Sequence, residues 1–270
     1  MSTHADKCAR FLALHHADTP LLLPNAWDRG TAVLFAYMGF GAIATTSGGH
    51  AATLGRLDGR VTLDEVFAHA AELAAATDVP LSVDFENGFA DDPAAVAANV
   101  AGVAAAGAAG CSIEDFSRRS DEPIYEIAAA AERVAAAADA AHRGDARLVL
   151  TARAENYLHG RADLADTIAR LQAYQAAGAD VLYAPGVHTV DDIRAVVSSV
   201  DLPVNVLALP HVPPVAELAA LGVHRISVGS GFNRVALAAT VDAASEFLER
   251  GTYEFWRATG SADTARAAFA

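Results

Sequence analysis

Residues 82–88 read Ser-Val-Asp-Phe-Glu-Asn-Gly, and residues 112–116 read Ser-Ile-Glu-Asp-Phe. Each run comes at the end of an apolar stretch that is typical of a buried strand. Hard divalent cations such as Mg2+ require oxygen ligands, which carboxylates converging at one mouth of a barrel would supply. These two runs therefore predict a metal site, provided that the rest of the chain builds such a barrel.

Eight stretches of the chain are predicted to be buried parallel strands. Ala-rich segments of helical character lie between them, and this repeat implies parallel pairing through helical crossovers. Eight strands and 270 residues suit one barrel. We therefore predict the α/β class, with residues 1–270 forming a single (β/α)8 TIM-type barrel domain. The predicted strands are Leu21–Trp27, Ala42–Ser47, Pro80–Glu86, Gly110–Phe116, Arg147–Ala154, Asp180–Pro185, Pro203–Ala208 and Arg225–Ser230.

Helical patterns fill the remaining segments, and Gly follows several of them just before a strand, as a left-handed helix stop. An N-terminal helix is expected to plug the bottom of the barrel, and residues 235–270 are expected to form a C-terminal helical extension at an oligomer interface. The predicted helices are Ser2–Ala17, Leu63–Ala76, Asp92–Ala106, Ile124–His142, Ala162–Ala177, Val190–Val200, Pro214–Leu221, Val235–Arg250 and Thr252–Ala270.

Composition excludes several classes of function. The formal net charge is -14, and no basic run with interleaved aromatic residues occurs, so nucleic acids and anionic membrane surfaces are poor partners. No apolar run approaches the ~20 residues of a membrane helix. Met1–Arg10 has no apolar signal core, and the two cysteines, Cys8 and Cys111, suit a reducing compartment, so a cytoplasmic location is expected. Lys7 is the only lysine and precedes the first strand, which argues against Schiff-base chemistry.

Polar residues gather at the carboxyl ends of the predicted strands, where the catalytic face of a barrel lies. Any one of them could be a helix cap or a loop hydrogen bond, but their joint occurrence favours a site. These residues are Asn25, Ser47, Asp84, Glu86, Glu114, Asp115, Arg153, Glu155, Asn205 and Ser230.

Six motifs, in this order and spacing, resemble those of the isocitrate lyase/phosphoenolpyruvate mutase superfamily. The resemblance runs from about residue 12 to about residue 237 and implies a barrel that holds Mg2+ at its carboxyl end, where the metal chelates a 2-oxo acid or its enolate. The motifs are Pro24-Asn25-Ala26-Trp27-Asp28, Thr46-Ser47-Gly48-Gly49, Leu54-Gly55-Arg56-Leu57-Asp58, Val83-Asp84-Phe85-Glu86-Asn87-Gly88, Ser112-Ile113-Glu114-Asp115 and Ala152-Arg153-Ala154-Glu155.

The resemblance also implies a set of metal ligands. Asp84 is similar to the direct ligand of the family, whereas Asp58, Glu86 and Glu114 are similar to the acids that hold metal-bound waters. Position 86 is Glu where many members have Asp, and the extra methylene fits a role that acts through water. Mg2+ is the expected cofactor, with Mn2+ as the alternative.

Substrate contacts follow from the same resemblance. The run Ser47-Gly48-Gly49 resembles the pocket that receives the substrate carboxylate, and amides in a small-residue loop suit an anion. Arg153 resembles the arginine that neutralises the enolate oxygen or a second acid group, and Asn205 is expected to line the far wall. We expect Arg153, Glu114 and His50 to take part in catalysis, with His50 as the best-placed proton donor.

The chain departs from the family in the loop after the fourth predicted strand. Family lyases carry a catalytic Cys in this loop, and the mutases carry a Lys and an Asn, whereas residues 116–123 read Phe-Ser-Arg-Arg-Ser-Asp-Glu-Pro. Cys111 begins the strand and is better read as a buried structural thiol. Arg118 and Arg119 either clamp a distal carboxylate or remain solvated. Tyr183 and His211 are further candidate proton donors.

The favoured function is a Mg2+-dependent carbon–carbon lyase for a small 2-oxo or 2-hydroxy carboxylic acid, working through an enolate. Decarboxylation of oxaloacetate is its simplest form, because it needs no acid for a leaving group, and cleavage of a substituted malate comes next. The alternatives are phosphoenolpyruvate mutase or phosphonopyruvate hydrolase chemistry, a non-catalytic 2-oxo acid binder, and a phosphate site at Val228-Gly229-Ser230-Gly231. The family often exchanges its eighth helix between subunits, so a homodimer or homotetramer is expected.

Overall fold

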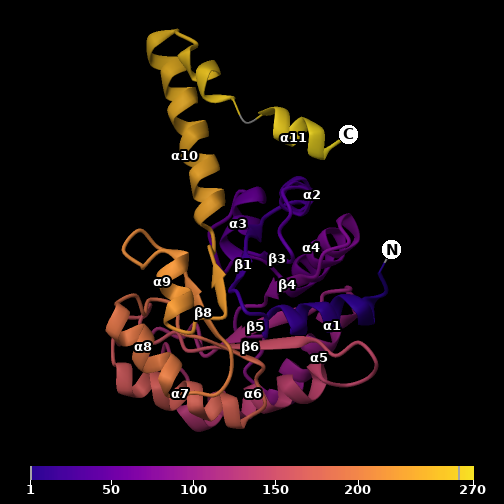
Figure 1. Ribbon diagram of the computed structural model, residues 1–270, viewed down its shortest axis with the longest axis vertical. Helices are drawn as coiled ribbons and strands as arrows, with labels where there is room; N and C mark the ends of the chain where they lie inside the picture. The colour runs from indigo at the N-terminus through magenta and orange to yellow at the C-terminus, as the bar shows by residue number, and fades with distance from the viewer. Residues whose placement is uncertain (1, 261) are drawn as a thin grey trace.

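The computed structural model describes residues 2–260 and 262–270. Its centre is a nearly closed barrel of parallel strands with helices packed around it (Figure 1). The predicted α/β barrel class is therefore confirmed. The strands are β1 Leu21–Leu23, β2 Asn25–Ala26, β3 Ile43–Thr45, β4 Leu81–Asp84, β5 Gly110–Glu114, β6 Val149–Arg153, β7 Val181–Tyr183, β8 Val204–Leu207 and β9 Arg225–Ser227.

The helices lie between the strands and after the last one. The α-helices are α1 His4–Leu14, α2 Arg29–Tyr37, α3 Ser47–Thr53, α4 Leu63–Ala76, α5 Pro93–Ala105, α6 Ile127–Ala141, α7 Leu164–Ala176, α8 Val190–Ser198, α9 Val215–Ala220, α10 Gly231–Ser245 and α11 Ala262–Ala268. A π-helical turn, Glu246–Arg250, continues α10, and a 3-10 helix covers Glu254–Ala258.

The first predicted strand is divided in two at Pro24, so the barrel has nine strand segments instead of eight. β1 pairs with β9, whereas β2 pairs with β3. Proline has no N–H to donate to a ladder, which explains the break, while its carbonyl accepts from Ala44 N at 2.9 Å. The side chain of Asn25 spans the division, because it donates to Thr45 O and accepts from Val228 N. The two edges of the sheet are thus joined through Pro24 and Asn25.

The register of the parallel strands brings the predicted site residues together. Asp84 at the end of β4 aligns with Ser112 in β5, and Glu114 at the end of β5 aligns with Arg153 at the end of β6. Carboxyl ends of parallel strands meet at one face of a barrel. Three charged side chains from three neighbouring strands therefore share that face.

Helix α1 packs at the opposite, amino-terminal ends of the strands, as expected for a plug. Lys7 Nζ donates to Ala74 O and Thr77 O, and the buried ring of Phe11 lies against Gly110 at the start of β5. A side chain at Gly110 would meet that ring and a backbone carbonyl, so glycine is required there. The bottom of the barrel is thereby filled with apolar and hydrogen-bonded groups.

Several helix boundaries differ from the predicted ones. Helix α4 matches its predicted bounds, but α2 and α3 were not predicted, because their short Gly-containing sequences carry a weak helical pattern. The residues before α6, Ile124 and Tyr125, are buried outside the helix, and Ile124 forms a bridge with Phe116. The predicted helix Thr252–Ala270 is instead a 3-10 helix followed by α11.

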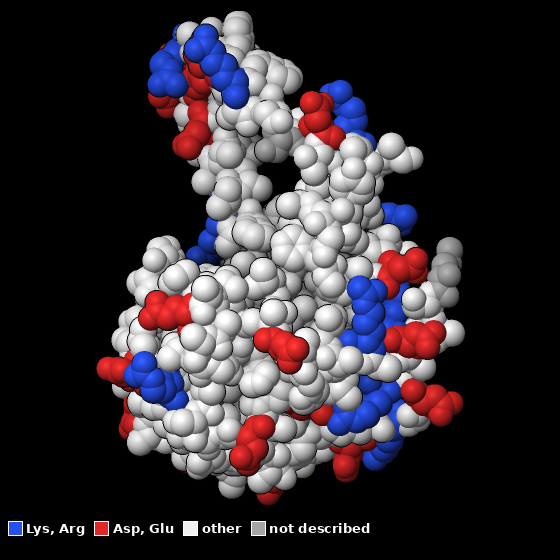
Figure 2. Space-filling view, in the orientation of Figure 1, with Lys and Arg blue, Asp and Glu red and all other residues white. Residues whose placement is uncertain are grey.

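The C-terminal arm, residues 231–260 and 262–270, extends away from the barrel. Figure 1 shows α10 rising from the barrel, and α11 returning toward α2. Figure 2 shows a mostly uncharged stem with Lys or Arg and Asp or Glu side chains gathered at its tip. Exposed apolar residues of the arm include Val235, Val241, Phe247, Leu248 and Trp256. None of the helices in the described part of the chain is both long and apolar enough to cross a membrane.

Candidate active site

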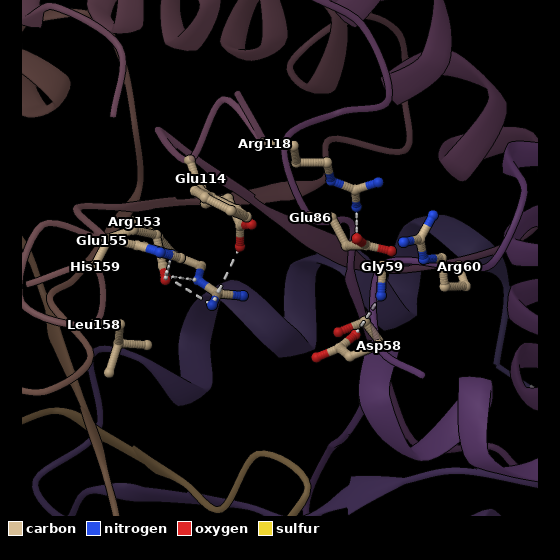
Figure 3. Close-up of a pocket in the computed structure, with 12 residues that line it drawn as sticks. Asp58, Gly59, Arg60, Glu86, Glu114, Arg118, Arg153, Glu155, Leu158 and His159 are labelled. Carbon is tan, nitrogen blue, oxygen red and sulfur yellow. Dashed lines mark hydrogen bonds and ion pairs between the residues drawn. The ribbon is translucent and has the colours of Figure 1, made fainter. Parts of the chain in front are cut away.

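A cavity of about 660 Å3 opens at the carboxyl ends of the strands. Figure 3 shows two groups of charged side chains in it, with Arg153, Glu155 and His159 on one side and Arg118 and Glu86 on the other. A smaller cavity of about 200 Å3 continues into the barrel, and both are lined by Arg153. The pocket therefore lies where the sequence placed the catalytic face.

Arg153 is the centre of the charged network. Its Nη1 donates to Asp84 Oδ1 at 2.8 Å and its Nε to Glu155 Oε1 at 2.9 Å, while Nη2 lies 3.2 Å from Glu114 Oε2. The side chain is only 15% exposed, so these pairs are poorly screened by water. The positive charge of one guanidinium thus balances the negative charges of carboxylates from three neighbouring strand ends.

Two of these carboxyl groups hold a proton more readily than usual. Burial raises the pKa of Glu114 well above its ordinary value, against the opposing effect of Arg153. Burial also raises the pKa of Glu155, again with Arg153 acting in the opposite direction. Such shifted carboxyl groups are typical of functional sites, although buried ion-pair networks produce them as well.

Asp84 is held in place by strand β3 and helix α3. Its backbone N–H donates to Thr45 Oγ1 at 2.8 Å, and its Oδ2 accepts from Ser47 N at 2.9 Å. The carboxylate lines the smaller, inner cavity, and both of its oxygens are oriented by the protein. This arrangement suits the ligand role that the resemblance implies for Asp84.

Glu86 lies in a strained backbone position beneath the loop that follows β5. Its φ of 46° is in the left-handed region, which non-glycine residues seldom adopt. Its Oε2 forms an ion pair with Arg118, whose own φ is 63°. The other oxygen, Oε1, is buried without a hydrogen-bond partner. Strain of this kind concentrates at functional sites.

The loop of residues 116–123 is short and internally braced. Ser117 N donates to Pro123 O at 2.7 Å, Ser117 Oγ donates to Glu122 O, and Arg119 N donates to Ser117 Oγ at 3.1 Å. Arg119 turns outward to Glu122, whereas Arg118 lines the pocket. The structure thus separates two neighbouring arginines whose roles the sequence left open.

The predicted carboxylate pocket is the first turn of helix α3 and not a loop. Thr46 caps this helix, and two of the three expected amides already have partners, since Ser47 N donates to Asp84 and Gly49 N to Thr46 Oγ1 at 3.4 Å. Ser47 lines the cavity, and Gly48 packs near the carboxylate of Asp58. The small residues here mainly allow close packing.

The carboxylates fit Mg2+ in their chemistry. Among the described residues, no three His, Cys, Asp or Glu side chains converge closely enough to form a preassembled metal centre. Glu114 and Glu86 nevertheless offer hard oxygen donors at the larger cavity and Asp84 at the smaller one that continues from it, and the buried Oε1 of Glu86 has no hydrogen-bond partner. Mg2+ retains several waters in many protein sites. Asp58 lies exposed at the pocket rim, where its carboxylate could contact Mg2+ through a metal-bound water.

Gly48 and Gly49 are not among the residues that line the two cavities, and two further predicted site residues, His50 and Asn205, are not either. His50 is buried and stacks on His69 with ring centroids 3.8 Å apart, and it is not among the residues that line the pocket. Asn205 is buried deeper in the barrel, where it donates to Ser227 Oγ and accepts from Arg225 Nε.

Sequence reasoning missed His159, which lines the pocket on the loop after β6. Its only signal was its position six residues after Arg153, because the loop has no periodicity that reveals which side chains face inward. The cysteines are outside the pocket lining, and burial raises the pKa of Cys111 to about 12. The expectation of a buried structural thiol at position 111 is consistent with this burial.

The family model described as phosphoenolpyruvate phosphomutase matches residues 11–248. The chain belongs to this family. The resemblance to the isocitrate lyase/phosphoenolpyruvate mutase superfamily is therefore confirmed. Curated members are similar over most of the chain: an uncharacterised protein of Mycobacterium tuberculosis is 37% identical over 82% of this chain and 81% of its own length. A 2-methylisocitrate lyase of Salmonella typhimurium is 34% identical over 68% of this chain and 63% of its own.

Other family members extend the range of chemistry. An oxaloacetate decarboxylase of Rhodopseudomonas palustris is 34% identical over 53% of this chain and 50% of its own length. Among solved structures, a lyase/mutase candidate from Burkholderia cenocepacia has a TM-score of 0.95 at 48% identity, covering 99% of this chain and 96% of that one. A phosphonopyruvate hydrolase complex with oxalate and Mg2+ has a TM-score of 0.82 at 25% identity, covering 91% and 88%.

Proposed function

We propose that this chain is a Mg2+-dependent carbon–carbon lyase that acts on a small 2-oxo or 2-hydroxy dicarboxylic acid through an enolate. The simplest form of the reaction is decarboxylation of oxaloacetate, and cleavage of a substituted malate is the next. The position of Arg153 carries this proposal, because its guanidinium lies among carboxylates at the floor of the pocket. The relatives named as lyase and decarboxylase support the same reaction class.

Arg153 would stabilise the negative charge that develops on the C2 oxygen of the substrate. A preorganised cation in a water-poor site is worth much more to a transition state than in bulk water. Asp84, with Glu86, Glu114 and Asp58 acting through water, would hold Mg2+, which when bound supplies a Lewis acid for the same charge. In the free protein, the ion pairs of Arg118 with Glu86 and of Arg153 with Asp84 balance the negative charge of these carboxylates.

The first test follows oxaloacetate by proton NMR with Mg2+, with chelator, and with an Asp84→Ala variant. We expect the wild type with Mg2+ to form pyruvate at least ~100-fold faster than either control, because the chelator removes the metal and Asp84→Ala removes its proposed ligand. A rate no higher than the Asp84→Ala background rejects decarboxylation as the main activity. Substituted malates and phosphonopyruvate then test the other reactions, and oxalate binding without any turnover favours a binder.

Arg118 sets the substrate class within this proposal. Its guanidinium lines the pocket opposite Arg153 and pairs with Glu86, so it is placed to bind the distal carboxylate of a dicarboxylic acid. We expect Arg118→Gln to raise KM for the dicarboxylate about 10- to 100-fold with little change in kcat, which corresponds to losing one charge-assisted contact. Steady-state kinetics measure both constants.

The control for Arg118 is its neighbour. Arg119→Gln removes the same charge from the same loop, but Arg119 faces Glu122 and the outer surface. Its KM should stay within about twofold of wild type. Equal effects from the two variants would show that only the general charge of the loop matters, and would contradict a specific contact by Arg118.

The C-terminal arm is proposed to pack against a second copy of the chain. Leu248 is 86% exposed, Trp256 68% and Val235 67%, and such apolar exposure on a projecting helix is costly for an isolated monomer. We expect light scattering to give the mass of a dimer or tetramer, and a Leu248→Glu, Trp256→Glu double variant to shift it toward the monomer. A monomeric wild type would contradict the exchange of this arm between subunits.

A further inference from the structure

His159 occupies a position in the pocket that the proposed function does not yet use. Its ring stacks on Phe116, with ring centroids 3.8 Å apart and planes inclined by 10°, and its Nε2 lies 3.8 Å from Glu155 Oε2. Figure 3 shows His159 beside Glu155 and Arg153. The side chain is 27% exposed, so the imidazole is oriented by the protein but still reached by solvent. These are the conditions under which a histidine can exchange protons with both a ligand and water.

The other candidate proton donors are less suitable in the structure. His50 stacks on His69 outside the pocket lining, and His211 is exposed with its ring against His188. Tyr183 reaches the inner cavity, but burial raises the pKa of its hydroxyl to about 12. Among the histidines of the described residues, His159 is the one that lines the larger cavity.

We infer that His159 is the catalytic group that exchanges a proton with C3 of the substrate. This inference rests on the proposed function. In decarboxylation, the C3–C4 bond breaks, carbon dioxide leaves, and the electron pair forms the C2=C3 bond of the enolate. His159, which has taken a proton from solvent to form the minority imidazolium, then donates that proton to C3; the C2 carbonyl re-forms, and pyruvate and the neutral resting imidazole result.

Burial favours the neutral form of His159 in the resting enzyme. Burial is the largest influence and lowers the pKa of His159 below its ordinary value, with Arg153 acting in the same direction and Asp115 in the opposite one. Glu155, from the end of β6, is the other charged group facing the ring. By microscopic reversibility, the neutral imidazole should remove a proton from C3 of pyruvate, which gives a direct assay.

The test measures two rates on the same protein. With Mg2+ in D2O, the pyruvate methyl signal in proton NMR reports exchange at C3, while carbon dioxide release from oxaloacetate reports bond cleavage. We expect His159→Gln to lower exchange at least ~100-fold, as is usual for loss of a general base, and to lower carbon dioxide release less than ~10-fold, because cleavage needs no proton. His16→Gln, an exposed histidine outside the pocket lining, is the control.

The outcomes separate this inference from the proposed function. Selective loss of exchange supports it, whereas unchanged exchange, or equal loss of both rates, overturns it and leaves the lyase proposal standing. A wild type that shows neither rate rejects the decarboxylase form of the proposed function, and with it the substrate on which this inference rests.

Two further measurements test the role of His159 independently of the rates of His159→Gln. Exchange by His159→Ala should be restored by added imidazole, with a rate that follows the concentration of the neutral form. The ring signal of His159 is assigned as the histidine signal that disappears from the NMR spectrum of His159→Gln. When this signal is titrated in the wild type without metal, its pKa should lie below about 6.5, the ordinary value for histidine. A pKa at or above that value would contradict a neutral resting base.

Discussion

Arg153→Met is expected to lower kcat by about 100- to 1000-fold or more and to destabilise the fold. The catalytic loss follows from removing the preorganised cation that faces the developing charge. The stability loss follows from leaving Asp84, Glu114 and Glu155 close together without their shared partner. Removing one member of a buried ion pair typically costs about 3–5 kcal/mol. Kinetics and urea denaturation measure the two effects separately.

The pH dependence of this variant has a definite sign. Burial already raises the pKa of Glu114 and Glu155, and loss of Arg153 removes the influence that lowers both. A carboxyl group whose pKa is raised in the folded state contributes stability below its unfolded pKa and loses it as pH rises through the folded pKa. The deficit of Arg153→Met relative to wild type should therefore be larger at pH 8 than at pH 5.5.

Two comparisons make the Arg153 result interpretable. Arg153→Lys keeps the charge but loses the planar fork of donors, so partial activity is expected. Arg194→Met removes an arginine from an exposed pair with Asp191 and should change the free energy of unfolding by less than about 0.5 kcal/mol. A similar small change in Arg153→Met would show that the three carboxylates do not depend on the guanidinium.

Asp115→Asn is expected to destabilise the protein by about 3 kcal/mol, because it breaks a buried charged network. Asp115 is 2% exposed, its Oδ1 accepts from Glu155 N at 2.8 Å, and its Oδ2 accepts from Arg170 Nη1 at 3.0 Å and Tyr174 Oη at 2.5 Å. In the asparagine variant, an NH2 group would face a donor on either side. The expected result is a lower urea midpoint with an unchanged slope.

Asp166 provides the matched control, because it pairs with the same arginine. Arg170 Nε donates to Asp166 Oδ2 at 2.8 Å, but the Asp166 side chain is 21% exposed and water can replace part of the contact. Asp166→Asn should therefore cost about 1 kcal/mol or less. If both aspartates cost the same, burial of Asp115 would not be the source of the effect.

Asp115 also connects the core to the active site. It holds the backbone of Glu155, whose side chain contacts Arg153 and lies beside His159. If Asp115→Asn loses activity under conditions in which it is still folded, the loss reports the role of Asp115 in holding Glu155 in place. Ligand binding stabilises the folded state, so a loss of activity that persists with bound ligand is not caused by unfolding.

Local sequence was sufficient to predict the barrel and most of its charged face. The strand patterns and the Gly stops predicted parallel strands joined by helices, and a polar residue at a strand end must lie on the shared face. The sequence alone could therefore place Asp84, Glu114 and Arg153 together. The strand register confirms that Glu114 aligns with Arg153, and that Asp84 ends the neighbouring strand, β4. Periodicity is a local property, so it survives in the sequence alone.

The tertiary structure decided how the loops and their side chains are used. It divided the first strand at Pro24, made a helix of the segment starting at Ser47, and turned Arg118 inward while Arg119 faces outward. It also placed His159 in the pocket and His50 outside it. These outcomes depend on partners far apart in the chain, and irregular segments have no repeating pattern from which the direction of a side chain can be read.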